Sequence, residues 1–191
     1  MVKCGARTGQ WIAKLQPLVD PIHETTMSNA VYNVLFLGTH NSARSIMAEV
    51  FLNECGRGRF KAFSAGVQPT GTVDPLALEF LEGNSRATSG LRSKHVNEFA
   101  SADAPVMDLV ISVCDDALGE PQPEWPAHTV STHWGIPDPT HVQGDHDARH
   151  HAFVAAATAV HRRIELLVAL PLASLDRLSL HSHLADVHRT A

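Results

Sequence analysis

The stretch that decides the fold runs from residue 32 to residue 44 and reads YNVLFLGTHNSAR. Residues 32–37 are mostly apolar and β-prone, which predicts a short buried strand. A polar turn begins at Gly38, and after it apolar residues recur at spacings of three and four, which predicts a helix ending near Gly56. A strand, a tight turn and a helix N-terminus together predict a site for a tetrahedral anion, because turn N–H groups and the helix dipole favour negative charge.

Outward from this stretch, predicted strands and helices alternate along the chain. Further strands are predicted over residues 60–64, 107–113 and 128–132, and further helices over residues 74–82, 91–99, 147–170 and after Pro171. This alternation predicts an α/β fold: one three-layer domain with a parallel, flavodoxin-like sheet and helices on both faces. Ligands of such sheets bind beyond the carboxyl ends of the strands, where the turn after the first strand lies.

The length and the first residues set the expected domain organisation. The chain has 191 residues, of which 44% are hydrophobic, enough for one domain with a substantial core. Residues 1–28 mix polar and apolar residues with glycine and proline, and lack the continuous apolar segment of a secretion signal. We expect them to form a disordered N-terminal extension, or to precede a true start at Met27. Residues 29–191 are expected to form the folded domain.

Charge and cysteine content narrow the expected partners. Lys and Arg total 15 against 20 Asp and Glu, a formal charge of -5, which argues against binding to nucleic acid or to a membrane surface. The sequence contains no apolar stretch of about 18 residues, so no membrane-spanning helix is predicted. The sparse, odd set of Cys4, Cys55 and Cys114 favours a reducing cytoplasm over a disulfide framework.

The turn itself supplies the candidate anion ligands. Arg44 lies at the predicted helix start, where its planar fork can hold two oxygens of an anion. Asn41 can orient the turn through side-chain hydrogen bonds, and Ser42 offers a hydroxyl. The candidate oxyanion-binding residues are therefore Gly38, Thr39, His40, Asn41, Ser42, Ala43 and Arg44.

Residues 34–49, VLFLGTHNSARSIMAE, resemble the signature of the low-molecular-weight protein tyrosine phosphatases and of the thiol-dependent arsenate reductases that share their fold. The resemblance is closer to the arsenate reductases and covers about residues 31–187. Further matching blocks are FSAG (63–66), TSGLRSK (88–94), APVMD (104–108), HWGIPDP (133–139) and LPLASLDRL (170–178). The resemblance implies the phosphatase fold with its anion loop after the first strand.

The chain departs from this family at the residues that carry its chemistry. The family pattern begins the loop with a nucleophilic cysteine, separated from the arginine by five residues, and Gly38 stands there instead. Cys114 matches the first cysteine that resolves the thiol adduct, while Gln122 stands where the second is expected. Asp138 matches the aspartate that protonates the leaving group. Asp138 and Cys114 are thus candidates for remnant catalytic roles.

Three hypotheses for the function remain open. The first is a pseudoenzyme that binds arsenate, phosphate or sulfate without the usual cysteine chemistry. The second is an active arsenate reductase in arsenic detoxification that uses Cys114 and an external thiol, with a small thiol, thioredoxin or glutaredoxin as redox partner. The third is a remnant domain that serves only a protein interaction. None of the three requires a cofactor.

Two other groups of residues are weaker candidates for sites. Thr39 as a substitute nucleophile is disfavoured, because it is one position out of register and lacks a predicted base. A histidine-rich segment could hold a metal, but it has no intact metal motif, and a solvated helix face is the better interpretation. Its residues are Asp145, His146, Asp147, His150 and His151. No metal centre is therefore expected.

Overall fold

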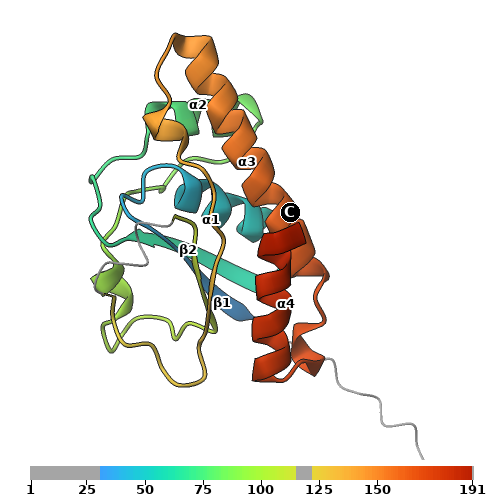
Figure 1. Ribbon diagram of the computed structural model, residues 1–191. Coiled ribbons are helices and arrows are strands. Elements are labelled where there is room, and N and C mark those ends of the chain that lie inside the picture. The colour runs from blue at the N-terminus through green and yellow to red at the C-terminus, as the bar shows by residue number, and fades with distance from the viewer. Residues whose placement is uncertain (1–30, 115–121, 191) are drawn as a thin grey trace, which may run out of the picture.

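The computed structural model describes residues 31–114 and 122–190, so the extension expected over residues 1–28 lies outside the described part. Figure 1 shows the chain as a twisted sheet with long helices packed along it. Its strands are β1 (Tyr32–Gly38), β2 (Phe60–Gly66), β3 (Leu109–Ser112) and β4 (Val130–His133). Its α-helices are α1 (Arg44–Cys55), α2 (Pro75–Gly83), α3 (His146–Ala169) and α4 (Arg177–Thr190). Short 3₁₀ helices span Val96–Phe99 (η1), Pro139–His141 (η3) and Leu172–Ser174 (η4).

The four strands form one parallel sheet in the order β2-β1-β3-β4, which confirms the predicted α/β fold. The register aligns the strand ends: Gly38 lies opposite Gly66, and Leu37 lies opposite Ser112. Ser112 in turn lies opposite His133. Because all four strands run the same way, the segments that follow β1, β3 and β4 emerge at the same edge of the sheet.

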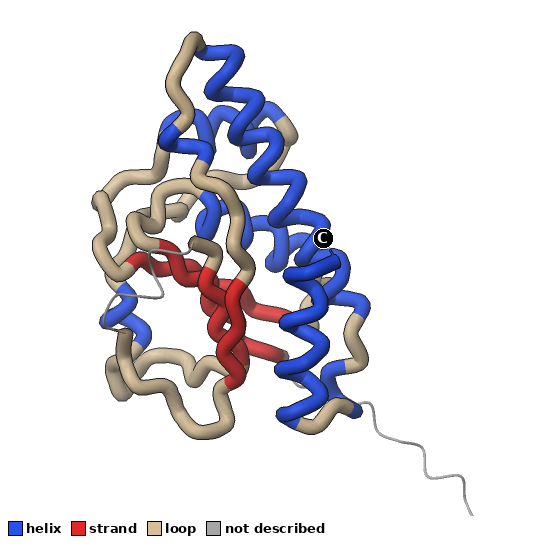
Figure 2. The backbone as a smooth tube through the Cα atoms, viewed as in Figure 1, coloured by secondary structure: helices blue, strands red, loops and turns tan. Residues whose placement is uncertain are grey.

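The two faces of the sheet are covered differently, as Figure 2 shows. Val34 and Phe36 of β1 face the core built with α1, α3 and α4. Leu35 and Leu37 face the opposite side, where a smaller core includes η1 residues and the partly buried Trp125. The alternation is that of a buried strand, whose successive side chains point to opposite faces. None of the described helices is long and apolar enough to cross a membrane.

Trp134 joins the sheet to the last helix. Its side chain is fully buried, its ring lies 6.0 Å from that of Phe36, and its Nε1 donates a hydrogen bond to the Leu184 carbonyl oxygen at 3.3 Å. A buried indole needs such an acceptor, and here the acceptor lies on α4. Trp134 also starts the segment that carries Asp138 back toward the first turn, so this packing positions a candidate site residue.

Part of the predicted helix over residues 91–99 is wrong. Only Val96–Phe99 is helical, as η1, and the chain before it is extended. Gly66 N donates to the Lys94 carbonyl oxygen at 2.8 Å, and His95 forms a parallel bridge with Gly66. Lys94 N donates to Asn41 Oδ1 at 2.8 Å. These long-range bonds keep the segment extended, because a helix would need the same backbone groups for itself.

The other differences are shifts of element boundaries. The strand predicted over residues 107–113 is shorter, at Leu109–Ser112, and the one over 128–132 lies slightly later, at Val130–His133. The helix expected directly after Pro171 begins at Arg177, because a 3₁₀ turn and an extended residue come first. Asp74 and Asp145 cap α2 and α3 by accepting bonds from Leu76 N and Ala148 N.

Gly66→Ala tests how closely β2 approaches the first turn. A Cβ at this position would lie 2.6 Å from the Thr39 carbonyl oxygen and 3.0 Å from Asn41 N, both backbone atoms. We expect the substitution to lower the free energy of unfolding by about 1–3 kcal/mol, the usual cost of overpacking. Gly83→Ala is the matched control, because nothing lies within 4 Å of its Cβ position. Urea denaturation of both variants measures the change. If Gly66→Ala is as stable as the protein without substitutions, the close approach of Gly66 to the turn is contradicted.

Candidate oxyanion site

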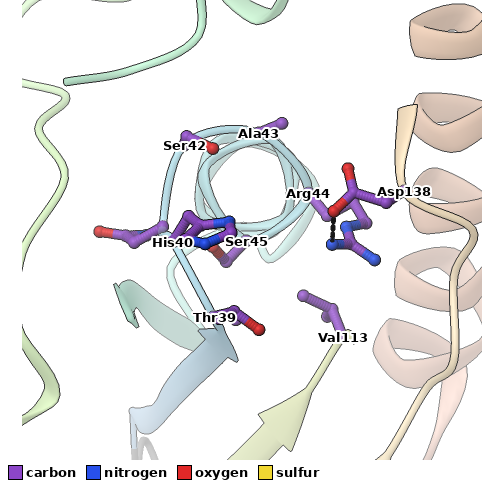
Figure 3. Close-up of a pocket in the computed structure, with 10 residues that line it drawn as sticks. Thr39, His40, Ser42, Ala43, Arg44, Ser45, Val113 and Asp138 are labelled. Carbon is purple, nitrogen blue, oxygen red and sulfur yellow. Dashed lines mark hydrogen bonds and ion pairs between the residues drawn. The ribbon is translucent and has the colours of Figure 1, made fainter. Parts of the chain in front are cut away.

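The turn after β1 surrounds a small cavity at the carboxyl edge of the sheet. All seven predicted oxyanion-binding residues line it, together with Ser45, Val113 and Asp138. Figure 3 shows these side chains around the N-terminal end of α1, with Asp138 reaching in from the segment after β4. The cavity volume is about 10 Å³, roughly the room of one water molecule, so it is too small for a bulky organic group. Arg44 opens α1, so the helix dipole adds partial positive charge here.

Hydrogen bonds from outside hold the carbonyl groups of the turn away from the cavity. Val67 N donates to the Gly38 oxygen at 3.1 Å, and Gln68 N donates to the Thr39 oxygen at 2.9 Å. The oxygens of His40 and Ser42 accept bonds from Thr70 N and Asp74 N in the same way, at 3.2 Å and 2.9 Å. In a planar trans peptide the N–H points opposite to the C=O, so the N–H groups of His40, Asn41 and Ala43 are turned to the cavity side.

Asn41 fixes the shape of the turn. Its φ of 49° is in the left-handed region, which asparagine adopts more readily than most residues. Its side chain is buried and donates through Nδ2 to Ser45 Oγ at 3.0 Å. Its Oδ1 accepts the bond from Lys94 N. Asn41 thus ties the turn both to the first turn of α1 and to the extended segment before η1, which matches its predicted orienting role.

Arg44 is already positioned by acceptors on the segment after β4. Its Nη1 donates to the Ile136 carbonyl oxygen at 2.7 Å, and its Nη2 pairs with Asp138 Oδ2. Both side chains are mostly buried, with 12% and 16% exposed. Among the described residues these contacts use two of the five N–H donors of the guanidinium, so the others can face a ligand. The structure therefore joins two predicted site residues that lie far apart in the sequence.

Asp138 carries a negative charge beside the cavity. Its Oδ1 accepts bonds from Thr140 N at 2.9 Å and from Thr140 Oγ1 at 2.7 Å. Burial alone would raise the pKa of the carboxyl group, but the Thr140 bonds and the positive charges of Arg44 and His141 outweigh it and hold the pKa below its usual range. The group is therefore ionised at neutral pH and acts only as a hydrogen-bond acceptor.

Gly38 occupies the floor of the cavity, and nothing in its surroundings demands glycine. Its φ is outside the left-handed region. A Cβ there would lie 3.3 Å from Ser45 Oγ, a tight contact with a hydroxyl that can rotate away, and 3.9 Å from Val113 Cγ2. A larger residue would therefore fit with a small adjustment. Glycine at this position is therefore not required by the backbone.

Cys114 lies next to the turn but outside the residues that line the cavity. Thr39 N donates to its Sγ at 3.1 Å, and Thr39 Oγ1 lies 3.1 Å from the same sulfur. Cys114 is buried and packs on the face of the sheet with the smaller core. Its position directly after β3 brings it beside the loop, because the strand ends are aligned. The Thr39 hydroxyl thus lies next to the Cys114 sulfur. That Thr39 does not act as a nucleophile stays a prediction.

A buried ion pair behind the turn was not predicted from the sequence. Lys94 Nζ lies 3.1 Å from Glu49 Oε2 and 3.2 Å from Ser64 Oγ, and Ser64 Oγ donates to the same carboxylate. Lys94 is 8% exposed, and its backbone N–H holds Asn41. The three residues come from α1, β2 and the segment before η1. Each of the three residues lies in one of the sequence blocks that resemble the arsenate reductases, and this membership could have indicated them.

The histidine-rich segment pairs with helix α2. His146 Nε2 lies 3.1 Å from Glu79 Oε2, and the His146 ring stacks on that of His150 at 6.1 Å. The hydrogen bond to Glu79 and its charge raise the pKa of His146. Among the residues that the structure describes, no group of three or more His, Cys, Asp or Glu side chains is arranged to hold a metal ion.

Cys55 is at the opposite end of α1 from the cavity. Its Sγ lies 3.7 Å from His161 Nε2 on α3. Burial and the charge of Glu165 both raise the pKa of the thiol, which disfavours the nucleophilic thiolate. These contacts favour a packing role for Cys55 over a chemical one.

Lys94→Met tests the support behind the turn. It leaves Glu49 charged and largely buried without its partner, which typically costs about 3–5 kcal/mol of stability. We expect a loss near the lower limit, since the Glu49 side chain keeps 18% exposure. Chemical denaturation measures the loss, with Lys61→Met at an exposed position of β2 as the control. Adding Glu49→Gln to Lys94→Met should recover part of it; no recovery would contradict the ion-pair explanation.

Known proteins share both this sequence pattern and this architecture. A glutaredoxin arsenate reductase of Synechocystis sp. is 33% identical over 106 residues, covering 56% of this chain and 77% of that protein. An arsenate reductase of Bacillus subtilis is 31% identical over 116 residues, covering 61% and 80%. A solved structure described as an arsenate reductase in the phosphate-binding state superposes with a TM-score of 0.59 and 30% identity, covering 73% of this chain and 98% of that one.

The family model for low molecular weight phosphotyrosine protein phosphatases matches residues 33–178. That range starts in β1, includes the turn, Cys114 and Asp138, and reaches the first residues of α4. With the parallel sheet and the aligned relatives, the match identifies the chain as a member of the low molecular weight phosphotyrosine protein phosphatase family, the family whose fold the arsenate reductases share.

Proposed function

We propose that this protein binds one tetrahedral oxyanion, arsenate or phosphate, in the turn formed by residues 38–44, without the cysteine-based catalysis expected of its relatives. The observation that carries the proposal is the orientation of the turn. The carbonyl oxygens of four of its residues accept bonds from the chain after β2, which turns the N–H groups of His40, Asn41 and Ala43 toward the cavity that Arg44 also lines. Backbone N–H groups and a guanidinium are the donors that an oxyanion needs.

The chemistry of the lining residues supports binding over turnover. A covalent route needs a nucleophile at the floor of the cavity, and glycine supplies none. Asp138 is held in its ionised form, so it has no proton to give to a leaving group at neutral pH. In subtilisin, an unrelated hydrolase, removal of the nucleophile alone lowers kcat by about 10⁶.

The relatives support the choice of ligand. Two of them are named arsenate reductases, and a related structure is described in a phosphate-binding state. Arsenate and phosphate have the same shape and nearly the same charge, so one cradle can accept either. A protein that kept this cradle but lost the nucleophile can hold the ion, sense it or buffer its concentration.

A second candidate function is arsenate reduction with an external thiol, and the position of Cys114 favours it. The external sulfur would bond to arsenic and release water, and Cys114 Sγ would then attack that sulfur. Breaking the As–S bond leaves its electron pair on arsenic, which yields arsenite and a mixed disulfide that a second thiol reduces. Cys114 lies beside Thr39 just beyond the end of β3, but its burial means that the sulfur must first become accessible.

Arg44→Ala tests anion binding directly. Calorimetric titration with arsenate and with phosphate should show binding to the unchanged protein and a loss of about 3 kcal/mol, more than a hundredfold in Kd, in the variant. The loss follows because the guanidinium donates charge-assisted bonds and the change also leaves Asp138 unpaired. Arg162→Ala, an exposed arginine on α3, is the control and should bind normally. Absence of binding to the unchanged protein would favour the protein-interaction hypothesis instead.

Gly38→Cys tests whether the missing nucleophile explains the loss of chemistry. The space at this position accepts a Cβ, so the variant should fold, and we expect slow hydrolysis of p-nitrophenyl phosphate where the unchanged protein shows none. Gly38→Ser is the matched control, since its hydroxyl is a far weaker nucleophile without a base.

Arsenate turnover with thioredoxin is a stricter version of the same test. It should require Gln122→Cys in addition to Gly38→Cys, because the thiol relay needs a second resolving sulfur. Robust turnover from Gly38→Cys alone would contradict this requirement. Turnover by the unchanged protein with added glutathione, lost in Cys114→Ser, would instead establish the second candidate function.

A further inference from the structure

We propose that Asp138 makes the cavity prefer oxyanions that still carry a proton, hydrogen phosphate and hydrogen arsenate, over sulfate. The inference rests on the proposed function, because it concerns which tetrahedral anion the turn accepts. The residues involved are Asp138, its partner Thr140, and Arg44.

The carboxylate is held rigidly at the place where an anion must pass or bind. Asp138 lines the same cavity as the turn, and its Oδ2 contacts the guanidinium that would hold the ligand. Its Oδ1 is fixed by the backbone N–H and the hydroxyl of Thr140 at the start of η3. A side chain bound at both oxygens does not easily turn away, so an ion on Arg44 has this carboxylate as a neighbour.

Two oxygen atoms can form a hydrogen bond with each other only when one of them carries a proton. An ionised carboxylate has acceptor oxygens and no donor. At neutral pH phosphate and arsenate each keep at least one proton, which a ligand oxygen can donate to Asp138 Oδ2. Sulfate has lost both protons under the same conditions, so its oxygen would meet the carboxylate without a hydrogen between them. The depressed pKa of Asp138 prevents the protein from supplying that hydrogen itself.

Gly38 sharpens this effect. Among the described residues that line the cavity, Asp138 is the acidic one and Arg44 is the basic one, apart from the titratable ring of His40. A cysteine thiolate at position 38 would add a second negative charge to the cavity. With glycine there, the negative charge that a ligand meets comes from a carboxylate that can accept a hydrogen bond from a protonated oxygen. Selection by proton content is therefore a consequence of both residues.

The experiment is calorimetric titration of the whole protein with phosphate, arsenate and sulfate near neutral pH, in a chloride buffer of constant ionic strength. We expect phosphate and arsenate to bind at least about tenfold more tightly than sulfate, a difference of about 1.4 kcal/mol. In Asp138→Asn the Oδ1 can still accept from Thr140, while the amide can donate to sulfate. The ratio of phosphate to sulfate affinity should then fall at least about tenfold, mainly through stronger sulfate binding.

The ratio is the quantity to compare, because Asp138→Asn also frees Arg44 and so strengthens the binding of every anion. Asp186→Asn is the matched control: it makes the same change in an exposed arginine ion pair on α4 and should leave the ratio unaltered. If the protein without substitutions binds sulfate as tightly as phosphate, the inference is wrong and the proposed function still stands. This outcome does not depend on whether Asp138→Asn folds. A ratio that Asp138→Asn leaves unaltered would also overturn it. Failure of all three anions to bind would overturn both.

Discussion

The cavity depends on one constraint, that the carbonyl oxygens of residues 38, 39, 40 and 42 are held outward. The bonds from Val67, Gln68, Thr70 and Asp74 impose this orientation, and all four donors lie on the chain that follows β2. That chain can lie so close to the turn because Gly66 places no side chain between them. In a planar peptide group the C=O and the N–H point in opposite directions. The N–H groups therefore point toward an anion only while the carbonyl oxygens keep their outer hydrogen bonds.

The contacts that support the turn are made by residues other than Gly38. Asn41 is held by Ser45 and Lys94, and Lys94 is held in turn by Glu49 and Ser64. Ser93 adds a bond from its hydroxyl to the His40 carbonyl oxygen at 2.8 Å. None of these contacts involves the side chain at position 38. The contact of position 38 with this support is its closeness to Ser45, because a Cβ there would lie 3.3 Å from Ser45 Oγ, the acceptor of the Asn41 bond.

The sequence predicts those parts of the site that follow from local pattern and parallel topology. The strand, turn and helix around Gly38 are visible as a change from continuous apolar residues to helical spacing. Cys114 and Asp138 are indicated by the resemblance to the family, and the structure places both near the turn. What the sequence does not reveal depends on partners distant along the chain. Residues 91–95 lose their helical tendency to bonds with Gly66 and Asn41. The Lys94 and Glu49 pair has no local signature, and neither does the contact between Arg44 and Asp138.

Arg44 and Asp138 set the balance between binding and chemistry. The ion pair and the Ile136 oxygen hold the guanidinium in place before a ligand arrives, which reduces the side-chain entropy lost on binding. Burial would raise the pKa of Asp138, but the Thr140 bonds, together with this pair, lower it and keep Asp138 ionised, and an ionised carboxylate is unsuited to protonate a leaving group. Gly38, which offers no side-chain nucleophile, and the ionised Asp138 thus both support the proposal of a turn that binds an anion without breaking a bond.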